Sequence, residues 1–158
     1  MNEGKATLIP EDRIAGDDEE DGSLLRAMAR EARAFIESHS WSSGVEAVSL
    51  LDGIGGVVAV FKVDLREAIG SWQDRSLWVV VGDLPSAYMV MDKLSSGPEV
   101  LDMYCELMED WARAVFASTP LEGLYPVRAA ATVENAEALL SRVDWLRTEV
   151  IPGWTSAP

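Results

Sequence analysis

The sequence has few of the side chains from which metal and nucleophilic centres are built. It holds one cysteine, Cys105, and one histidine, His39. A single cysteine cannot form an internal disulfide, and a structural zinc site needs a set of Cys and His ligands that this chain cannot supply. A carboxylate-bound Mg²⁺ or Ca²⁺ at Asp64 and Asp83 is the alternative, but strand-end aspartates more often cap turns. We therefore expect no metal and no cofactor.

Familiar catalytic and nucleotide-binding motifs are also missing. The chain has no G-x-x-x-x-G-K-[ST] loop and no G-x-S-x-G elbow, and the glycines of residues 53–56 lack the full dinucleotide fingerprint. A serine hydrolase would have to recruit His39, which follows a predicted helix end where a cation is favourable. Cys105 belongs to an apolar helical stripe, which favours an inert core thiol. We predict turn, helix-end and core roles for these residues.

Basic residues are scarce relative to acidic ones. The chain has 13 Lys and Arg against 27 Asp and Glu, a net charge of −14. An acidic surface repels polyphosphates and anionic lipid, whereas it attracts a basic protein. We expect no nucleic-acid partner and no membrane partner, and we keep a basic protein as a candidate partner.

Long apolar runs are absent as well. No stretch approaches the roughly 18 apolar residues of a transmembrane helix, and the N-terminus lacks the basic start and apolar core of a signal peptide. Hydrophobic residues nevertheless make up 48% of the chain and include six tryptophans. This composition is typical of a globular protein, and the expected location is the cytoplasm.

The first 22 residues differ in composition from the rest. They hold eight acidic and two basic residues, and residues 17–21 are all acidic. Such a charge run predicts a disordered acidic tail over residues 1–22, followed by a single domain over residues 23–158.

Three helices are predicted from apolar residues at three- and four-residue spacing. The first covers residues 24–38 behind a Ser23 N-cap, and its other face carries the basic stripe Arg26, Arg30 and Arg33. The second has Pro98 in its first turn and runs through residue 117. The third covers residues 133–150, is capped by Thr132 and ends at residues 152–153.

The strands are predicted from two valine-rich runs, residues 57–64 and 77–82. Residues 45–51 supply another strand, with turn residues 52–56 between it and the next, and residues 87–91 supply a fourth after Pro85. The fold class is therefore α+β, a small antiparallel meander of three or four strands packed with three helices in the order α-β-β-β-(β)-α-α.

One block of sequence is similar to a known family. Residues 58–62, a polar connector and the pattern Trp-x-x-x-Gly-Asp-Leu-Pro-Ser at residues 78–86 precede an acidic amphipathic helix. Over residues 25–118 this arrangement resembles a family of short acidic bacterial proteins of unknown function. The acidic tail and the connector depart from that family's pattern. The resemblance implies a shared fold and a bacterial origin, and it carries no activity.

Two functions compete. The favoured one is a non-enzymatic interaction or regulatory module, because the chain lacks the familiar combinations of catalytic residues. The second predicted helix also has an acidic face that includes Glu106 and Asp110. Trp72 and Trp154 fit neither periodic pattern and are candidate interface residues, since aromatic side chains are enriched at interfaces. An acidic immunity-type inhibitor of a basic toxin is a special case of this function.

The alternative is a small-molecule-binding protein or enzyme with a carboxylate site at the strand ends around Asp83. It would use Asp83, Asp64 and Tyr88, together with Arg66 or Arg75, because a carboxylate pair can perform acid–base work when burial raises one pKa. We also expect a homodimer, because a sheet of three or four strands leaves edges exposed.

Overall fold

A computed structural model describes residues 7–69, 74–91 and 93–155. The chain divides into two compact units, Met1–Ser96 and Gly97–Pro158, which are treated separately below. This division differs from the single domain expected over residues 23–158. The first unit has its own apolar core between a sheet and a helix, and the second is a group of helices. Trp72 lies outside the described residues.

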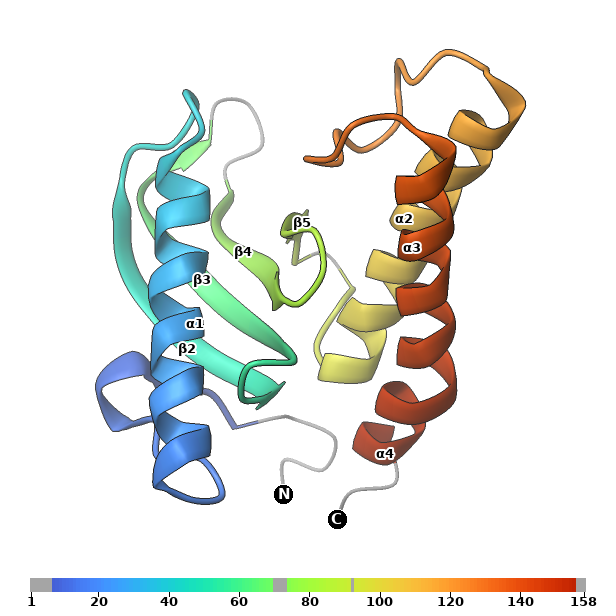
Figure 1. Ribbon diagram of the computed structural model, residues 1–158. Coiled ribbons are helices and arrows are strands. Elements are labelled where there is room, and N and C mark those ends of the chain that lie inside the picture. The colour runs from blue at the N-terminus through green and yellow to red at the C-terminus, as the bar shows by residue number, and fades with distance from the viewer. Residues whose placement is uncertain (1–6, 70–73, 92, 156–158) are drawn as a thin grey trace. The chain divides into compact units, whose positions relative to one another are not determined.

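The first unit contains a five-stranded antiparallel sheet in the order β1-β2-β3-β4-β5 (Figure 1). Each strand pairs with its neighbours in sequence, which confirms the α+β class and the meander, including its fourth predicted strand. The strands are β1 (Ile9–Pro10), β2 (Val45–Ile54), β3 (Val58–Ile69), β4 (Asp74–Gly82) and β5 (Ala87–Val90). The two-residue β1 is an addition to the expected set.

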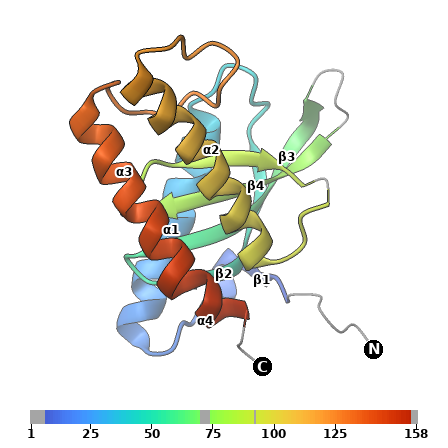
Figure 2. The same cartoon turned by 90° about the vertical axis from the view of Figure 1, so that its right-hand side faces the viewer.

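Helix α1 (Glu19–Glu37) covers one face of this sheet (Figures 1 and 2). Because side chains alternate along a strand, every second residue of each central strand points to that face. These residues and the apolar stripe of α1 form one buried cluster. Its sheet members include Phe61, Val63, Leu77 and Val79, and its helix members include Ile36, all below 1% exposed.

The acidic N-terminal segment is folded where the structure describes it. Helix α1 begins at Glu19, five residues earlier than expected, because Asp18 is its N-cap in place of Ser23. The Asp18 side chain accepts a hydrogen bond of 2.8 Å from the backbone N–H of Asp21. Ile14 is buried in the cluster beneath α1. The expectation of disorder through residue 22 is therefore wrong for residues 7–22. The acidic composition predicted a disordered tail, because composition gives no information on which carboxylates cap a helix.

Two arginines of the predicted basic stripe of α1 bind the N-terminal segment or the start of β2. Arg26 donates a hydrogen bond of 2.7 Å to the carbonyl of Ile14, and Arg33 forms an ion pair with Glu11. Arg33 also donates to the carbonyl of Val45 at the start of β2. Two of the three arginines therefore bind main chain beside α1.

Strands β3 and β4 extend further than the valine-rich runs. The residues between the predicted strands 57–64 and 77–82 were expected to form a polar connector, but β3 continues to Ile69 and β4 begins at Asp74. The register changes between Asp64 and Ile69, where β3 has three more residues than β4. Residues 65–68 of this segment form an irregular bulge, called the β3 bulge below.

The second unit consists of α2 (Gly97–Ala117) and α3 (Val133–Trp145), followed by a π-helical turn (Leu146–Val150) and α4 (Ile151–Thr155). Helices α2 and α3 pack against each other and run antiparallel (Figure 2). The Thr132 cap is confirmed, since its side chain accepts from Asn135 N–H at 3.1 Å. The expected stop at residues 152–153 is wrong: the backbone stays helical from α3 through the π-helical turn, and Pro152 lies within α4.

Candidate functional site

The two aspartates proposed as a strand-end pair lie far apart. Strand pairing sets Val58 opposite Gly82, next to Asp83, and sets Asp64 opposite Ser76. At about 3.3 Å per residue, the six steps from Val58 to Asp64 span roughly 20 Å of sheet. The structure therefore does not assemble Asp64 and Asp83 into one carboxylate site.

Asp83 lies in the turn after β4. Its backbone N–H donates to the carbonyl of Val57 at 2.9 Å, and its side chain is exposed. The preceding Gly82 has φ 147°, and a Cβ there would lie 2.2 Å from the Val57 oxygen. Only glycine allows the two strands to approach this closely, which explains the Gly-Asp sequence at this corner.

Asp64 instead belongs to a polar patch at the other end of the same two strands. Its Oδ1 accepts a hydrogen bond of 2.5 Å from the Ser76 hydroxyl and lies 3.4 Å from Lys62 Nζ. A surface cavity of about 310 Å³ opens beside it and is lined by Glu46, Ala47, Asp64, Arg75 and Ser76.

A second cavity of about 380 Å³ shares two residues with the first. It is lined by Val45, Glu46, Arg66 and Arg75. Arg75 Nη2 donates to Glu46 at 2.6 Å, and both Nε and Nη2 donate to the Leu65 carbonyl in the β3 bulge. The sequence grouped Arg66 and Arg75 with Asp83. The structure places them with Glu46, which sequence reasoning missed because the bulge brings them together.

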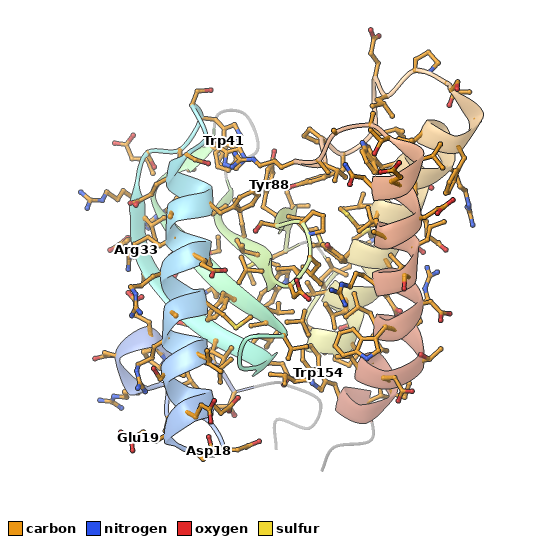
Figure 3. All side chains as sticks on the ribbon, viewed as in Figure 1. Asp18, Glu19, Arg33, Trp41, Tyr88 and Trp154 are labelled. Atoms are coloured by element: carbon orange, nitrogen blue, oxygen red, sulfur yellow. The ribbon has the colours of Figure 1, made fainter. Side chains whose placement is uncertain are left out.

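Tyr88 is part of an aromatic cluster near the C-terminal end of α1, together with Phe35, His39 and Trp41. Figure 3 shows Tyr88 and Trp41 side by side, and their ring centroids are 5.0 Å apart. The His39 ring lies 5.1 Å from Tyr88 and 4.7 Å from Trp41. The sequence pattern did not single out Trp41 as a site residue.

His39 has the helix-end position predicted from the sequence. Its Nδ1 lies 2.8 Å from the carbonyl oxygen of Phe35 in the last turn of α1. Because a carbonyl only accepts, Nδ1 carries the proton in this contact. The imidazole therefore caps α1 and supports the aromatic cluster.

In the second unit, α2 presents an acidic face. Glu99, Asp102, Glu106 and Asp110 are exposed and recur at three- and four-residue spacing, which places them on one side of the helix. Of these, Glu106 and Asp110 make no ion pair with any residue in the described part of the chain. These four side chains are called the α2 acidic face below.

Glu109, beside that face, is neutralised within the unit. Arg147 donates to both of its carboxylate oxygens, at 2.6 and 2.9 Å, and Arg113 lies 3.8 Å away. The hydrogen bonds from Arg147 hold the pKa of the Glu109 carboxyl below its usual range. They also raise the pKa of the Arg147 guanidinium. On α2, Glu109 is therefore ion-paired, whereas Glu106 and Asp110 make no ion pair with a described residue.

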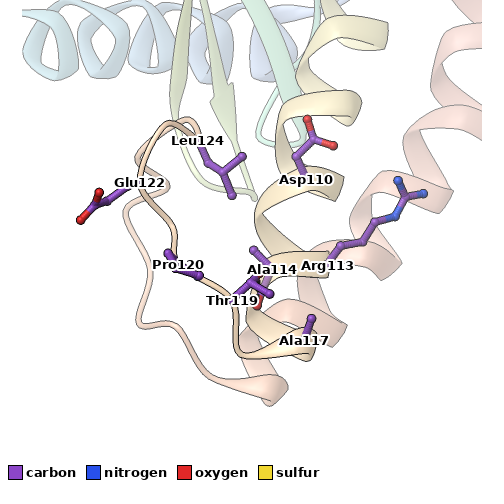
Figure 4. A pocket seen from close by; sticks show the side chains of 8 residues that line it. All are labelled: Asp110, Arg113, Ala114, Ala117, Thr119, Pro120, Glu122 and Leu124. Atoms are coloured by element: carbon purple, nitrogen blue, oxygen red, sulfur yellow. Dashed lines mark hydrogen bonds between the residues drawn. The ribbon is translucent and has the colours of Figure 1, made fainter.

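A groove of about 400 Å³ begins where the α2 acidic face ends. Figure 4 shows the loop after α2 curling back beside the C-terminal turns of the helix. The groove is lined by Asp110, Arg113, Ala114, Ala117, Thr119, Pro120, Glu122 and Leu124. Its lining combines small apolar groups and Leu124 with two carboxylates, the Arg113 guanidinium and the Thr119 hydroxyl. We call it the α2 groove.

The turn that shapes the α2 groove uses an unusual residue. The Thr119 N–H donates to the Ala114 carbonyl at 2.9 Å, and the Ser118 N–H donates to Val115 at 3.2 Å, as in a Schellman helix end. Ser118 has φ 54°, a left-handed conformation that glycine usually adopts.

The side chains of Cys105 and Trp154 are buried or half-buried within the second unit. Cys105 is buried on α2, with its Sγ 4.0 Å from the Val143 carbonyl, and burial raises the pKa of its thiol to about 11. This environment agrees with the predicted inert core thiol. Trp154 is half-buried on α4, a helix that packs against α2.

Over residues 7–69, 74–91 and 93–155, no three metal-ligating side chains come together, and no helix is long and apolar enough to cross a membrane. Comparison with protein-family models, curated proteins and solved structures found no match.

Proposed function

We propose that the chain is a cytoplasmic protein-interaction module that binds a basic partner through the α2 acidic face and the adjoining α2 groove. The observation that carries this proposal is the continuity of the two features. Asp110 is the last member of the face and the first lining residue of the groove.

Charge supports the partner's chemistry. The unit Gly97–Pro158 holds ten acidic and four basic residues, a net charge of −6. Of its arginines, Arg113 and Arg147 lie against Glu109, so they do not neutralise Glu106 or Asp110. A single-sign surface of this kind accelerates encounter with a partner of opposite charge.

The α2 groove supplies an apolar binding surface in addition to the charge of the α2 acidic face. Exposed ion pairs contribute only about 0–1 kcal/mol each, so a specific complex also needs an apolar anchor. Ala114, Ala117, Pro120 and Leu124 offer an apolar surface for one side chain of the partner. The expected ligand is therefore a segment with an apolar residue flanked by Lys or Arg.

The test uses a synthetic amphipathic peptide of leucine and lysine as the probe, titrated by calorimetry and by NMR of the labelled protein. We expect shifts on α2 and on residues 118–124, and loss of binding in the double variant Glu106→Lys/Asp110→Lys. Its matched control is Glu134→Lys/Glu137→Lys, which reverses two exposed carboxylates on α3. Equal loss in both variants would show a general charge effect and contradict the proposal.

We further propose that the chain forms a homodimer through the edge of β5. This strand pairs with β4 on one side and has no strand on its other side among the described residues. Val90 on this strand is 39% exposed. Unpaired strand edges favour pairing with a second copy. Light scattering should give a dimer mass that Val90→Lys reduces to a monomer mass; a monomer mass for the unmodified chain would contradict this proposal.

A further inference from the structure

The two cavities beside the β3 bulge belong to the first unit and are independent of the interaction proposed above. We infer that they form a binding site for a small oxyanion, presented by a carboxylate or a phosphate group, with Arg66 and Arg75 as the anion-binding residues. The inference rests on how these two side chains are held and on which of their donors are unused.

Arg75 is fixed in place by only part of its guanidinium group. Nε and Nη2 donate to the Leu65 carbonyl at 3.3 and 3.1 Å, and Nη2 also donates to Glu46. A guanidinium carries five N–H donors, two of them on Nη1. Nη1 makes no hydrogen bond within the described part of the chain. The Arg75 guanidinium is therefore held in place, and the two N–H donors of Nη1 remain available to a ligand.

Arg66 lines the cavity of about 380 Å³ together with Arg75. Its backbone N–H donates to the Gly44 carbonyl at 3.0 Å, and its side chain runs across Gly44. A Cβ at Gly44 would lie 3.2 Å from Arg66 Nε, so the glycine, with φ 102°, leaves room for this side chain. The guanidinium of Arg66 makes no hydrogen bond or ion pair to any described residue.

These positions favour an oxyanion over other ligands. Two guanidinium groups and one carboxylate, Glu46, line this cavity, and Glu46 is already bound to Arg75. Planar guanidinium forks match the two oxygens of a carboxylate or a phosphate. The adjoining cavity of about 310 Å³, which Ala47, Ser76 and Asp64 also line, leaves space for the remainder of a small molecule. The Asp64 carboxylate in it already contacts Ser76 and Lys62.

Glu46 acts as an internal competitor in this site. Its carboxylate occupies one donor of Arg75 at 2.6 Å, and both side chains are more than half exposed, so the pair exchanges readily with solvent. An incoming anion would bind the unused donors and would be opposed by the charge of Glu46. Removing that charge should therefore strengthen binding, whereas removing Arg66 should weaken it.

The experiment titrates the ¹⁵N-labelled full chain with sodium phosphate and, separately, with sodium succinate, at an ionic strength held constant with sodium chloride. We expect saturable shifts of the amides of Val45, Glu46 and Arg66 and of the Arg75 Nε–H signal. A response to phosphate alone assigns the ligand to phosphate groups, and a response to succinate alone assigns it to carboxylates. Shifts that do not saturate with either anion overturn the proposal.

Three variants then test the residues. Arg66→Gln should raise the dissociation constant about tenfold, equivalent to ~1.4 kcal/mol, and Glu46→Gln should lower it. The control Arg30→Gln, at an exposed arginine on α1, removes the same charge and should leave the constant unchanged. Equal weakening by Arg66→Gln and Arg30→Gln would show a general charge effect, and weaker binding by Glu46→Gln would show that Glu46 does not compete with the anion; either result overturns the assignment.

Discussion

The chain has two acidic regions of similar composition that are used in opposite ways. In the N-terminal segment, carboxylates accept internal hydrogen bonds: Asp18 caps α1, Asp21 accepts from the Gly55 N–H at 2.8 Å, and Glu11 pairs with Arg33. On α2, Glu106 and Asp110 make no ion pair within the described residues. Acidic composition alone therefore does not distinguish carboxylates that stabilise the fold from carboxylates available to a partner.

The carboxylates of the two regions contribute differently to the free energy of unfolding. A carboxylate that caps a helix or accepts a backbone N–H stabilises the folded state by about 1 kcal/mol or more, because its loss leaves a donor unsatisfied. An exposed carboxylate with no internal contact contributes little to folding. Changes in the N-terminal segment should therefore alter stability, and changes on α2 should alter binding.

The largest effect is expected at Ile14, which joins the N-terminal segment to the core. Its side chain is 3% exposed within the cluster beneath α1. Ile14→Ala should lower the free energy of unfolding by about 3 kcal/mol, as buried large-to-small changes do. Urea denaturation measures the loss, with Val133→Ala, at a side chain 51% exposed, as the control. Similar small losses for both variants would show that the segment is not part of the core.

A smaller loss is expected when Asp21 is shortened. Its carboxylate accepts backbone N–H groups from Asp17 and, at 2.8 Å, from Gly55 in the β2–β3 turn. Asp21→Ala should cost about 1–2 kcal/mol, since two donors lose their acceptor. Hydrogen exchange should show faster exchange at the Gly55 amide. An unchanged exchange rate there would contradict the contact.

The fold was largely predictable where side-chain periodicity is strong. Helix α2 follows from its apolar stripe, and β3 and β4 follow from their valine-rich runs. Strand β1 was not predictable, because two residues that include Pro10 carry no strand pattern. The start of α1 was misplaced because Asp18 and Ser23 are both good N-cap residues, and only the structure shows that the Asp18 side chain accepts from the Asp21 N–H.

The candidate sites were less predictable than the fold. Asp64 and Asp83 both end predicted strands, but antiparallel pairing separates them by about half the length of β3. The contact between Arg75, Glu46 and the Leu65 carbonyl depends on the register shift in the β3 bulge. No spacing along the chain encodes such a shift, so the grouping of these residues could not be inferred from sequence.

A gain in stability is expected at the end of α2, next to the acidic face. Ser118 adopts φ 54°, and glycine occupies this conformation without steric cost. Ser118→Gly should raise the free energy of unfolding by about 0.5–1 kcal/mol, as thermal or urea denaturation would show. The α2 carboxylates are untouched, so probe binding should persist. A destabilised variant would contradict the assigned helix end.

The smallest effect is expected at Asp52, a half-buried carboxylate on β2. Burial raises its pKa, and the hydrogen bond from the Gly53 N–H at 3.0 Å only partly opposes this shift. A raised pKa means that the folded state binds the proton more tightly, so this group lowers stability progressively as pH rises through its folded pKa. Asp52→Asn should therefore be more stable than the unmodified chain at neutral pH, and its advantage should shrink in acid. An advantage that grows on acidification would contradict this sign.

The central claim, that the two acidic regions differ in use, is tested most directly by two double variants of equal charge change. Asp18→Ala/Asp21→Ala and Glu106→Gln/Asp110→Gln each remove two carboxylates. For each, the free energy of unfolding and the dissociation constant for the leucine–lysine peptide are measured in the same buffer. We predict that the first variant loses stability and retains peptide binding, and that the second retains stability and loses peptide binding. Equal loss of binding in both variants, or equal loss of stability, would contradict the claim.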